Sequence, residues 1–313
     1  MVEAQEISPQ TTTSHEVRGR ALGALVGLAV GDALGAPVEF KARDSFPPVT
    51  EMMAGGYFRL PAGAWTDDTA MALCLAESLN HAPDFDAQDL LNRFLRWMDA
   101  HENTSTGKCI GVGQNTLAVL GHYRRTGEVV APPIKGRSDG NGALMRVAPV
   151  AVRHWSDLTK AREIATAQSR ATHCSIFSEQ ICVAMMDILT GLIAGKSWSV
   201  VTGDITSLEV SSEIKPIFQG SWRDKNRDQI SSSGYVVDTF EAALWAIEST
   251  GTFEEAVIAA VNLGHDADTV GAVAGQLAGA RYGIDAIPQR WLQCLIKLDE
   301  IQERFDCLWS STD

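Results

Sequence analysis

Four oxygen-bearing side chains stand together at the start of one helical pattern, in the stretch GAWTDDTAMAL. They are Thr66, Asp67, Asp68 and Thr69. One of them would suffice to cap a helix that runs to about residue 80, because Thr and Asp oxygens accept hydrogen bonds from the free amides of a first turn. Adjacent carboxylates should repel each other unless a cation lies between them. The run alone therefore allows two interpretations, a capped helix or part of a metal site.

A second cluster of similar composition opens another helical pattern near the C-terminus, in VNLGHDADTVGAVAGQ. Its members are Asp266, Asp268 and Thr269. Two acidic helix starts of matching composition favour one shared site over two independent caps. Carboxylate and hydroxyl oxygens are hard ligands that suit Mg²⁺ or Mn²⁺ and are poor for copper or structural zinc. The sequence therefore predicts a metal site formed by the two helix starts.

Glycines at every fourth position mark the two helices that would bring these clusters together. The glycines are Gly23, Gly27, Gly31 and Gly35 near the N-terminus, and Gly271, Gly275 and Gly279 after the second cluster. Each costs about 1 kcal/mol of helix propensity relative to Ala, so a gain must offset it. Close backbone approach between two small-faced helices explains the regular spacing better than two loose Ala/Gly helices would.

The rest of the chain is dominated by further helical patterns. They fall at residues 87–99, 115–125, 159–169, 178–194, 239–248, 253–261 and 287–305. Strand-like composition is confined to residues 199–210 and 234–238. Asp238 and Glu241 have the form of a capping box at the start of the helix expected at 239–248. Residues 199–233 are the least regular and are expected to form a surface excursion that borders a cleft. Since no linker divides the chain, we expect one all-α domain over residues 17–313, with residues 1–16 as a disordered or frayed tail.

Composition excludes several classes of protein. Of 313 residues, 45% are hydrophobic and 21% charged, which is typical of a folded globular domain. The net charge of −13 disfavours general binding to nucleic acid or to anionic membranes. The apolar run ALGALVGLAV is too short to span a bilayer and lacks the continuation of a signal peptide. The six cysteines show no zinc-type spacing, so we expect reduced thiols and a cytoplasmic location.

Five motifs, read in order along the chain, together resemble the ADP-ribosylglycohydrolase family. They are GLAVGDALGAPVEF, WTDDTAMAL, GNGALMRVAPVAV, THCSIFSEQ and NLGHDADTVGAVAGQLAGARYG, and they extend over nearly the whole chain after about residue 17. The resemblance implies an all-α domain that holds a pair of Mg²⁺ or Mn²⁺ ions in a cleft. It implies a hydrolase that cleaves the glycosidic bond at the ribose anomeric carbon, releasing ADP-ribose from a modified acceptor such as a protein side chain.

The resemblance also implies roles for individual residues. The metal ligands fall on Thr66, Asp67, Asp68, Asp266, Asp268 and Thr269. Glu39, which ends the motif GDxxGxxxE, falls at the metal site close to the attacking water. The candidate catalytic residues are therefore Glu39, Asp67 and Asp268, and Asp268 is expected to serve both metals.

Three further segments correspond to the parts of the family that bind the rest of ADP-ribose. They supply Gly140, Asn141, Gly142 and Ala143 beside the diphosphate, His173 near the phosphates and ribose, and Tyr235 near the adenine. Each has a plainer alternative. The glycine-rich segment could be only a turn, His173 a structural histidine, and Tyr235 a packing residue.

The acceptor is less well defined than the bond cleaved. Family members specific for arginine commonly carry an aspartate in a CFDIG-like segment, and the matching stretch KCIGVGQNT has Gly111 at that position. Arginine, serine and other acceptors therefore stay open, as does an ADP-ribosylated nucleic acid or small conjugate. A catalytically silent ADP-ribose-binding relative is a further alternative, although no metal ligand is missing. A phosphohydrolase built on His265 and Asp266 would need more suitably spaced histidines than the seven present.

Overall fold

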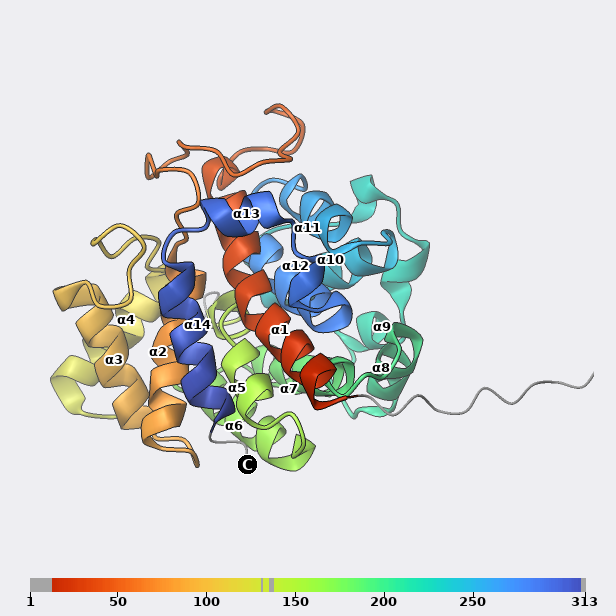
Figure 1. Ribbon diagram of the computed structural model, residues 1–313. Coiled ribbons are helices and arrows are strands. Elements are labelled where there is room, and N and C mark those ends of the chain that lie inside the picture. Colours follow the sequence, from red (N-terminus) through yellow and green to blue (C-terminus); the bar gives the residue numbers. More distant parts are fainter. Residues whose placement is uncertain (1–12, 131, 135–137, 311–313) are drawn as a thin grey trace, which may run out of the picture.

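The computed structural model describes residues 13–130, 132–134 and 138–310, and within these ranges the protein is all-helical (Figure 1). The described residues contain no strand, only the isolated bridges Gly55–Leu60 and Gly140–Tyr235. Their α-helices are α1 (Ser14–Gly35), α2 (Asp67–His81), α3 (Ala87–Ala100), α4 (Gln114–Thr126), α5 (Ala148–Arg153), α6 (Leu158–Arg170), α7 (Ile176–Ile193), α8 (Trp198–Asp204), α9 (Lys215–Phe218), α10 (Val236–Glu248), α11 (Phe253–Val261), α12 (Ala267–Tyr282), α13 (Gln289–Cys294) and α14 (Leu298–Trp309). The predicted fold class, a single all-α domain, is confirmed.

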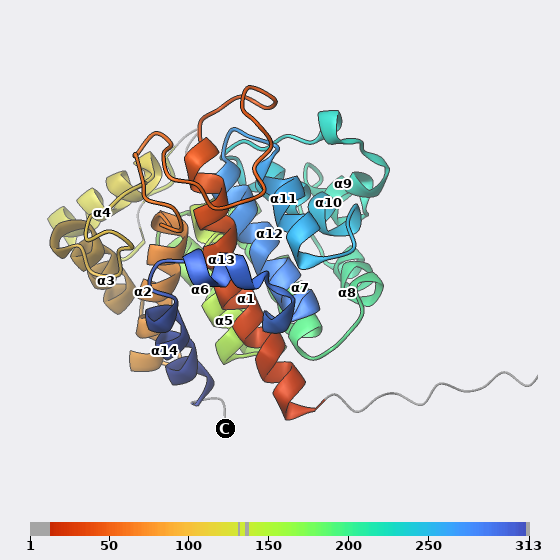
Figure 2. The ribbon, with the colours of Figure 1, turned by 45° about the horizontal axis from the view of Figure 1, so that its top comes forward.

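Helices α1 and α12 lie side by side through the centre of the molecule, as both ribbon views show (Figures 1 and 2). Helices α7, α10 and α11 contact α12, while α5 and α14 contact α1. Short 3-10 helices supply several connections, and two of them, η1 (Ala36–Val38) and η2 (Asn141–Ala143), border the site described below. The long connection from Glu39 to Thr66 arches over the C-terminal end of α1 (Figure 2).

The glycine stripes form the antiparallel seam between α1 and α12, as their spacing predicted. Gly23, Gly27 and Gly31 face Gly279, Gly275 and Gly271 in turn. A Cβ at any of these six positions would overlap with a carbonyl oxygen of the facing helix. The propensity cost of glycine is therefore offset by backbone contact that no larger residue permits. The seam holds the C-terminal end of α1 against the N-terminal end of α12.

Two helices, α1 and α7, are long and apolar enough to cross a membrane by length and composition alone. In the structure the apolar window of α1 is entirely inside the fold, and 72% of that of α7 is buried as well. Both therefore serve here as core helices of the bundle, which is the place expected for the run ALGALVGLAV.

Several local predictions were wrong. Residues 199–210 and 234–238, whose composition is strand-like, are helical for the most part, and Val201, Ile205 and Val236 are buried in the helical core rather than in a sheet. Asp238 does not cap α10, since the helix already begins at Val236 and Asp238 accepts hydrogen bonds from Ser231 and Ser233. The helix expected at 287–305 is broken between α13 and α14, where Lys297 has a φ of 60°.

The segment expected to be irregular, residues 199–233, instead folds into α8, α9 and three 3-10 helices, η3 (Ile205–Ser207), η4 (Ser221–Asp224) and η5 (Arg227–Gln229). The N-terminal boundary also differs, because α1 begins at Ser14 with a capping box between Thr13 and Glu16. The predicted tail of residues 1–16 otherwise lies outside the described residues.

Candidate active site

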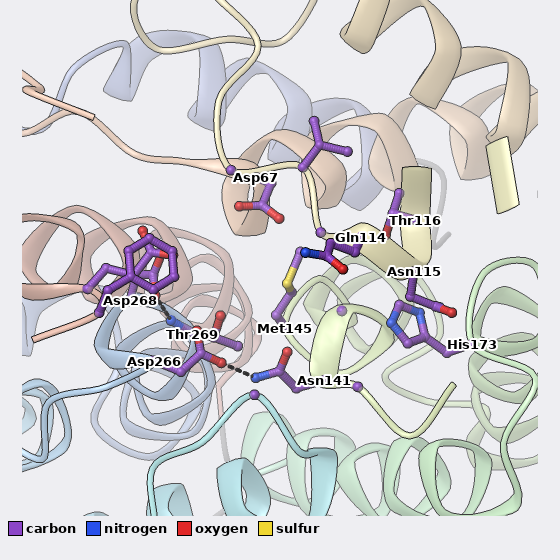
Figure 3. Close-up of a pocket in the computed structure, with 18 of the residues that line it drawn as sticks. Asp67, Gln114, Asn115, Thr116, Asn141, Met145, His173, Asp266, Asp268 and Thr269 are labelled. Atoms are coloured by element: carbon purple, nitrogen blue, oxygen red, sulfur yellow. Dashed lines mark hydrogen bonds between the residues drawn. The ribbon is translucent and has the colours of Figure 1, made fainter. Parts of the chain in front are cut away.

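A cleft of about 460 Å³ opens where α1 ends and α2 and α12 begin, a size typical of small-molecule sites (Figure 3). Its lining comes from eight separate parts of the chain. The lining residues are Glu39, Phe40, Phe58, Asp67, Gly111, Val112, Gly113, Gln114, Asn115, Thr116, Gly140, Asn141, Gly142, Met145, His173, Gly234, Asp266, Asp268 and Thr269. Carboxylates gather at one end, with Asp266 and Asp268, whereas His173 and Asn115 lie at the other.

Asp32, on the C-terminal part of α1, controls the start of α2. Its completely buried carboxylate accepts hydrogen bonds from the backbone N–H and hydroxyl of Thr66, at 2.9 Å each, and from those of Thr69, at 3.0 and 2.6 Å. An acceptor at this position satisfies free amides and complements the positive end of the helix dipole. Asp32, although it belongs to α1, therefore acts as the N-terminal cap of α2.

The capping interpretation of the TDDT run therefore fails. Thr66 is the N-cap residue of α2, yet its side chain makes no capping hydrogen bond and is turned toward Asp32. Asp67 faces the cleft, and Asp68 is buried beneath it with one carboxylate oxygen that has no hydrogen-bond partner among the described residues. Since Asp32 accepts from the free amides at the start of α2, Asp67 and Asp68 are not needed as caps and are available to bind a cation.

Asp268 joins two groups of three carboxylates. The first group is Asp32, Asp68 and Asp268, and the second is Glu39, Asp266 and Asp268. Within each group the candidate ligand atoms lie within 4.8 Å of one another. Asp268 is 2% exposed, and one of its oxygens accepts from the backbone N–H of Thr269 at 2.9 Å. Asp268 is therefore the one carboxylate that the two groups share, whereas its predicted role of serving both metals stays a prediction.

Burial and mutual repulsion raise the pKa values of these carboxyls. Burial, and then the charges of Asp268 and Asp67, raise the pKa of Glu39 to about 11. Burial is also the first cause that raises the pKa of Asp32 to about 6 and the pKa of Asp67 and of Asp68 well above the usual range. So many acids can be ionised together only if a positive charge is bound among them.

The residues present fit a divalent metal centre. Oε2 of Glu39 and Oδ1 of Asp68 are buried without a hydrogen-bond partner in the described part of the chain. Buried polar atoms are normally satisfied, so two unpaired carboxylate oxygens within one acidic cluster point to a cation as the missing partner. The donors are oxygens throughout, as Mg²⁺ or Mn²⁺ requires.

Backbone pairing places the two outer carboxylates. The N–H of Phe40 donates to the carbonyl of His265 at 2.6 Å, and the N–H of His265 donates to the carbonyl of Lys41 at 2.7 Å. These bonds join the segment after Glu39 to the segment before Asp266. This pairing explains why Glu39 and Asp266, more than 220 positions apart in sequence, belong to one group of carboxylates.

The uncharged end of the cleft is built around η2. Asn141 Nδ2 donates to Asp266 Oδ2 at 2.6 Å and to Thr239 Oγ1 at 2.8 Å, so this amide ties the two ends together. The neighbouring Gly142 leaves room for His173, because a Cβ there would lie 2.7 Å from Cε1 of the imidazole. Burial lowers the pKa of His173 to about 3, so the ring is neutral near pH 7.

Most predicted site residues meet in this cleft, but not all of them. Thr66 and Asp68 are buried and do not line the cleft, and neither does Ala143, the fully buried last residue of η2. Tyr235 is not part of the lining and is 37% exposed, with its ring edge against Phe177. Its backbone, however, pairs with Gly140, which places Gly234 in the wall. The structure thus does not bring the Tyr235 ring into the cleft.

Sequence reasoning missed two parts of the site. Asp32 was not predicted, although a carboxylate within the apolar helix ALGALVGLAVGDALG is itself a signal, because a buried acid must be paired. The start of α4 was interpreted as an ordinary helix, yet Gly113, Gln114, Asn115 and Thr116 line the cleft. The glycines in GVGQNT, directly before a helix, could have indicated amides exposed to a ligand.

Gly111 lies directly against Asp67. Its φ is 85°, which glycine adopts easily and most other residues do not. A Cβ at Gly111 would overlap with Oδ1 of Asp67. An aspartate at this position would therefore displace Asp67, and the carboxylate of Asp67 itself occupies that part of the cleft.

Comparison with known proteins identifies relatives along almost the whole chain. The family model described as ADP-ribosylglycohydrolase matches residues 13–312. The ADP-ribosylarginine hydrolase of Serratia proteamaculans is 41% identical over 94% of this chain and 80% of its own length. The ADP-ribosyl-[dinitrogen reductase] glycohydrolase of Rhodospirillum rubrum is 35% identical over 95% of this chain and 97% of its own length.

A solved structure gives the same picture. The chain from the ADP-ribosylglycohydrolase-related protein complex superposes with a TM-score of 0.85 at 38% identity. The match covers 96% of this chain and all of that one. The arrangement of helices around the acidic cleft is therefore shared with a protein whose sequence is also clearly related.

Proposed function

Because this chain belongs to the ADP-ribosylglycohydrolase family, it is a glycosidase-type hydrolase that releases ADP-ribose, and we propose that its substrate is an arginine-linked ADP-ribosyl protein. The observation that carries the proposal is the acidic centre joined by Asp268 within a cleft of ligand size. The choice of arginine is supported by the relative from Serratia proteamaculans, which is named for that acceptor.

We propose that the acidic centre holds a pair of Mg²⁺ or Mn²⁺ ions. Asp32, Asp68 and Asp268 would surround one ion, and Glu39, Asp266 and Asp268 the other. The Thr66 hydroxyl lies beside Asp32 and Asp68, whereas the predicted ligand Asp67 is in neither group. When bound, such ions polarise ribose hydroxyl oxygens and lower the pKa of a nearby water. The remaining steps depend on side chains of this chain.

Glu39 is positioned to take the proton from the attacking water. Its Oε2 has no hydrogen-bond partner among the described residues, and with one oxygen of the carboxylate at a bound ion the other would accept the proton. The backbone hydrogen bonds between Phe40 and His265 fix the position of Glu39 relative to Asp266. Proton removal by a positioned carboxylate is general base catalysis. Asp67, which faces the cleft outside both groups of carboxylates, would stabilise the positive charge that develops on the ribose ring during cleavage.

Asp67 also meets the requirement for a cationic acceptor. With Gly111 unable to carry a side chain, Asp67 is the carboxylate that an incoming guanidinium would meet at this wall. The described lining of the cleft contains no lysine or arginine that would repel that guanidinium. A compact positive acceptor therefore fits this side of the cleft.

Release of free ADP-ribose tests the proposal. Three substrates, ADP-ribosylated on arginine, on serine and on a nucleic-acid end, would be incubated with Mg²⁺, with Mn²⁺ and with EDTA. We expect metal-dependent release from the arginine-linked substrate. Release from the serine-linked or nucleic-acid substrate instead would refute arginine as the acceptor. Binding of ADP-ribose without release from any substrate would favour a catalytically silent ADP-ribose-binding protein.

A cytoplasmic location completes the proposal. The six cysteines form no disulfide within the described residues, and Cys74 and Cys182 are buried. Free thiols are usual in a reducing compartment. Fractionation of cells that produce the protein, followed by detection with an antibody, would test the location.

A further inference from the structure

Arg146 is a completely buried guanidinium without a carboxylate partner among the described residues. Its Nε donates to Oε1 of Gln168 at 2.9 Å, and its Nη2 donates to the Gln168 carbonyl at 2.9 Å and to Oγ1 of Thr172 at 2.8 Å. The guanidinium carbon lies 4.9 Å from the centre of the Phe94 ring. A buried cation held only by neutral groups is costly, so this arrangement calls for a role beyond packing.

The hydrogen bonds of Arg146 favour one direction for the hydrogen bond between Thr172 and His173. Burial lowers the pKa of Arg146 to about 9, which leaves the guanidinium charged near neutral pH. A guanidinium can only donate, so the Thr172 oxygen must accept from it. The hydroxyl proton of Thr172 has no other acceptor among the hydrogen bonds of the described residues, and Nδ1 of His173, which lies 2.9 Å from that oxygen, can accept it.

His173 responds with a defined tautomer. A neutral imidazole accepts at one nitrogen and donates at the other, so acceptance at Nδ1 places the proton on Nε2. The edge of the ring that carries Nε2 lies against Gly142, and the ring borders the cleft (Figure 3). No residue in the described ranges forms a hydrogen bond with Nε2. The Nε2–H group is therefore available to a ligand.

Two further hydrogen bonds fix the same network to the cleft wall. Asn115 Nδ2 donates to the Thr172 carbonyl at 2.6 Å, which ties it to the start of α4. Gln168 Nε2 donates to the carbonyl of Ala143 at 3.0 Å, which ties it to η2. The three wall segments around His173 thus share one set of buried polar contacts, so the ring has little freedom to turn over.

We propose that Arg146 is a positioning residue that acts through Thr172 to hold His173 as an Nε2–H donor toward an oxygen of bound ADP-ribose. The identity of the ligand rests on the proposed function, whereas the proton arrangement rests on the hydrogen bonds alone. The recognised group is an oxygen acceptor, on a phosphate or on a ribose. Neither Arg146 nor Thr172 lines the cleft, so both would act without touching the ligand.

The tautomer can be measured in the free protein. Ring nitrogen signals of protein labelled with ¹⁵N-histidine distinguish a protonated from an unprotonated nitrogen, and a His173→Gln variant identifies which signals belong to this residue. We expect a single neutral form with the proton on Nε2. A proton on Nδ1 in the wild-type protein would overturn the proposal without any further variant.

A pair of substitutions tests the role of the network in binding. Thr172→Val removes the hydroxyl and keeps the side-chain shape, whereas Thr172→Ser keeps the hydroxyl. We expect Thr172→Val to give a mixture of tautomers and roughly tenfold weaker binding of ADP-ribose by calorimetry, with Thr172→Ser close to wild type.

Two results with the Thr172 variants would contradict the positioning role of Arg146 and Thr172. If Thr172→Val lowers the melting temperature but changes neither the histidine signals nor the affinity for ADP-ribose, Arg146 and Thr172 are structural only. An equal loss in both Thr172 variants would also contradict the proposal. If the Thr172→Val variant does not fold, the ¹⁵N-histidine spectrum of the wild-type protein still shows whether the proton is on Nε2 or on Nδ1. Failure to release ADP-ribose from any substrate would refute the proposed function while leaving the tautomer result intact.

Discussion

The carboxylate end of the cleft and its uncharged end are built on different backbone elements and have opposite needs. The acidic end is formed where α1 finishes and α2 and α12 begin, and its members, such as Asp68 and Asp268, are buried with raised pKa values. The other end presents neutral groups, among them Asn141, His173 and the first turn of α4 (Figure 3). The acidic end has no positive charge among its described residues to balance its carboxylates, whereas the uncharged end presents hydrogen-bond donors to the cleft.

This difference separates two tasks within one cleft. The acidic end is stable as a charged cluster only with cations, so it is the end at which metal-assisted bond cleavage fits. The first three amides of α4 have no partners within the helix, and the helix dipole adds partial positive charge there. The uncharged end therefore suits an oxygen-rich anionic ligand. Changes at the acidic end should lower kcat, and changes at the uncharged end should raise KM.

Removal of divalent metal should have the largest effect. After dialysis against EDTA, we expect ADP-ribose release to fall to background, because no counter-charge would remain for the carboxylates. The melting temperature should also fall, since a ligand at 100 times its Kd stabilises a fold by about 2.7 kcal/mol. Addition of Mg²⁺ or Mn²⁺ should restore both quantities, and full activity in EDTA would contradict the metal centre.

Asp268→Asn should come next. It removes the one carboxylate common to both groups while keeping the size of the side chain. We expect kcat to fall by roughly 100- to 1,000-fold, as when other active sites lose one charge-stabilising group. Stabilisation by Mg²⁺ in thermal denaturation should weaken as well, whereas the affinity for ADP-ribose without metal should change little.

A matched substitution controls for the general effect of losing an acid. Asp299→Asn makes the same chemical change on an exposed residue at the start of α14. Its activity and its response to Mg²⁺ should equal those of the wild type. If Asp268→Asn keeps both its activity and its metal response, the acidic end is not the reactive end.

The sequence predicted the acidic end better than the uncharged end, and the reason is physical. Local repetition reveals a cluster such as Asp266, Asp268 and Thr269, and the glycine spacing shows that two helices must approach closely. Asp32 was missed because its partners, the amides and hydroxyls of Thr66 and Thr69, are more than 30 positions away. The sequence pattern of α1 alone cannot show that one of its side chains caps α2.

The uncharged end depends almost entirely on contacts that are distant in sequence. The amide of Asn141 finds its acceptors on residues 239 and 266, and Asn115 donates to the Thr172 carbonyl. Nothing local distinguishes such residues from ordinary turn or helix residues. Tyr235 shows the reverse case, because its motif position suggested contact with the ligand while its ring packs against Phe177 outside the cleft.

Gly142→Ala should separate the two ends. The new methyl group would press on the imidazole of His173, at 2.7 Å from Cε1, without reaching the carboxylates. We expect KM and the Kd for ADP-ribose to rise about tenfold, with kcat and the metal requirement close to wild type. Gly203→Ala is the control, since a Cβ there has no neighbour within 4 Å. A fall in kcat with unchanged KM would refute the division of tasks.

Gly23→Ala should have the smallest effect on chemistry, because it alters the support shared by both ends. Gly23 lies on α1, two helical turns or more before Asp32, and a Cβ there would overlap with the carbonyl oxygen of Gly279. Overpacking of this kind costs roughly 1–3 kcal/mol of unfolding free energy. Denaturation by urea should show the loss.

The kinetic result of Gly23→Ala then distinguishes support from specific positioning. If the seam only holds α1 and α12 together, kcat and KM of the folded fraction should both stay near wild type. Gly19→Ala is the matched control on the same helix, because its Cβ would meet only a methyl group of Ile284 at 4.0 Å. A selective loss of kcat in Gly23→Ala would instead mean that a displacement at the far end of the seam reaches Asp32 and the carboxylates, and that the acidic end depends on the exact spacing of the two helices along their whole length.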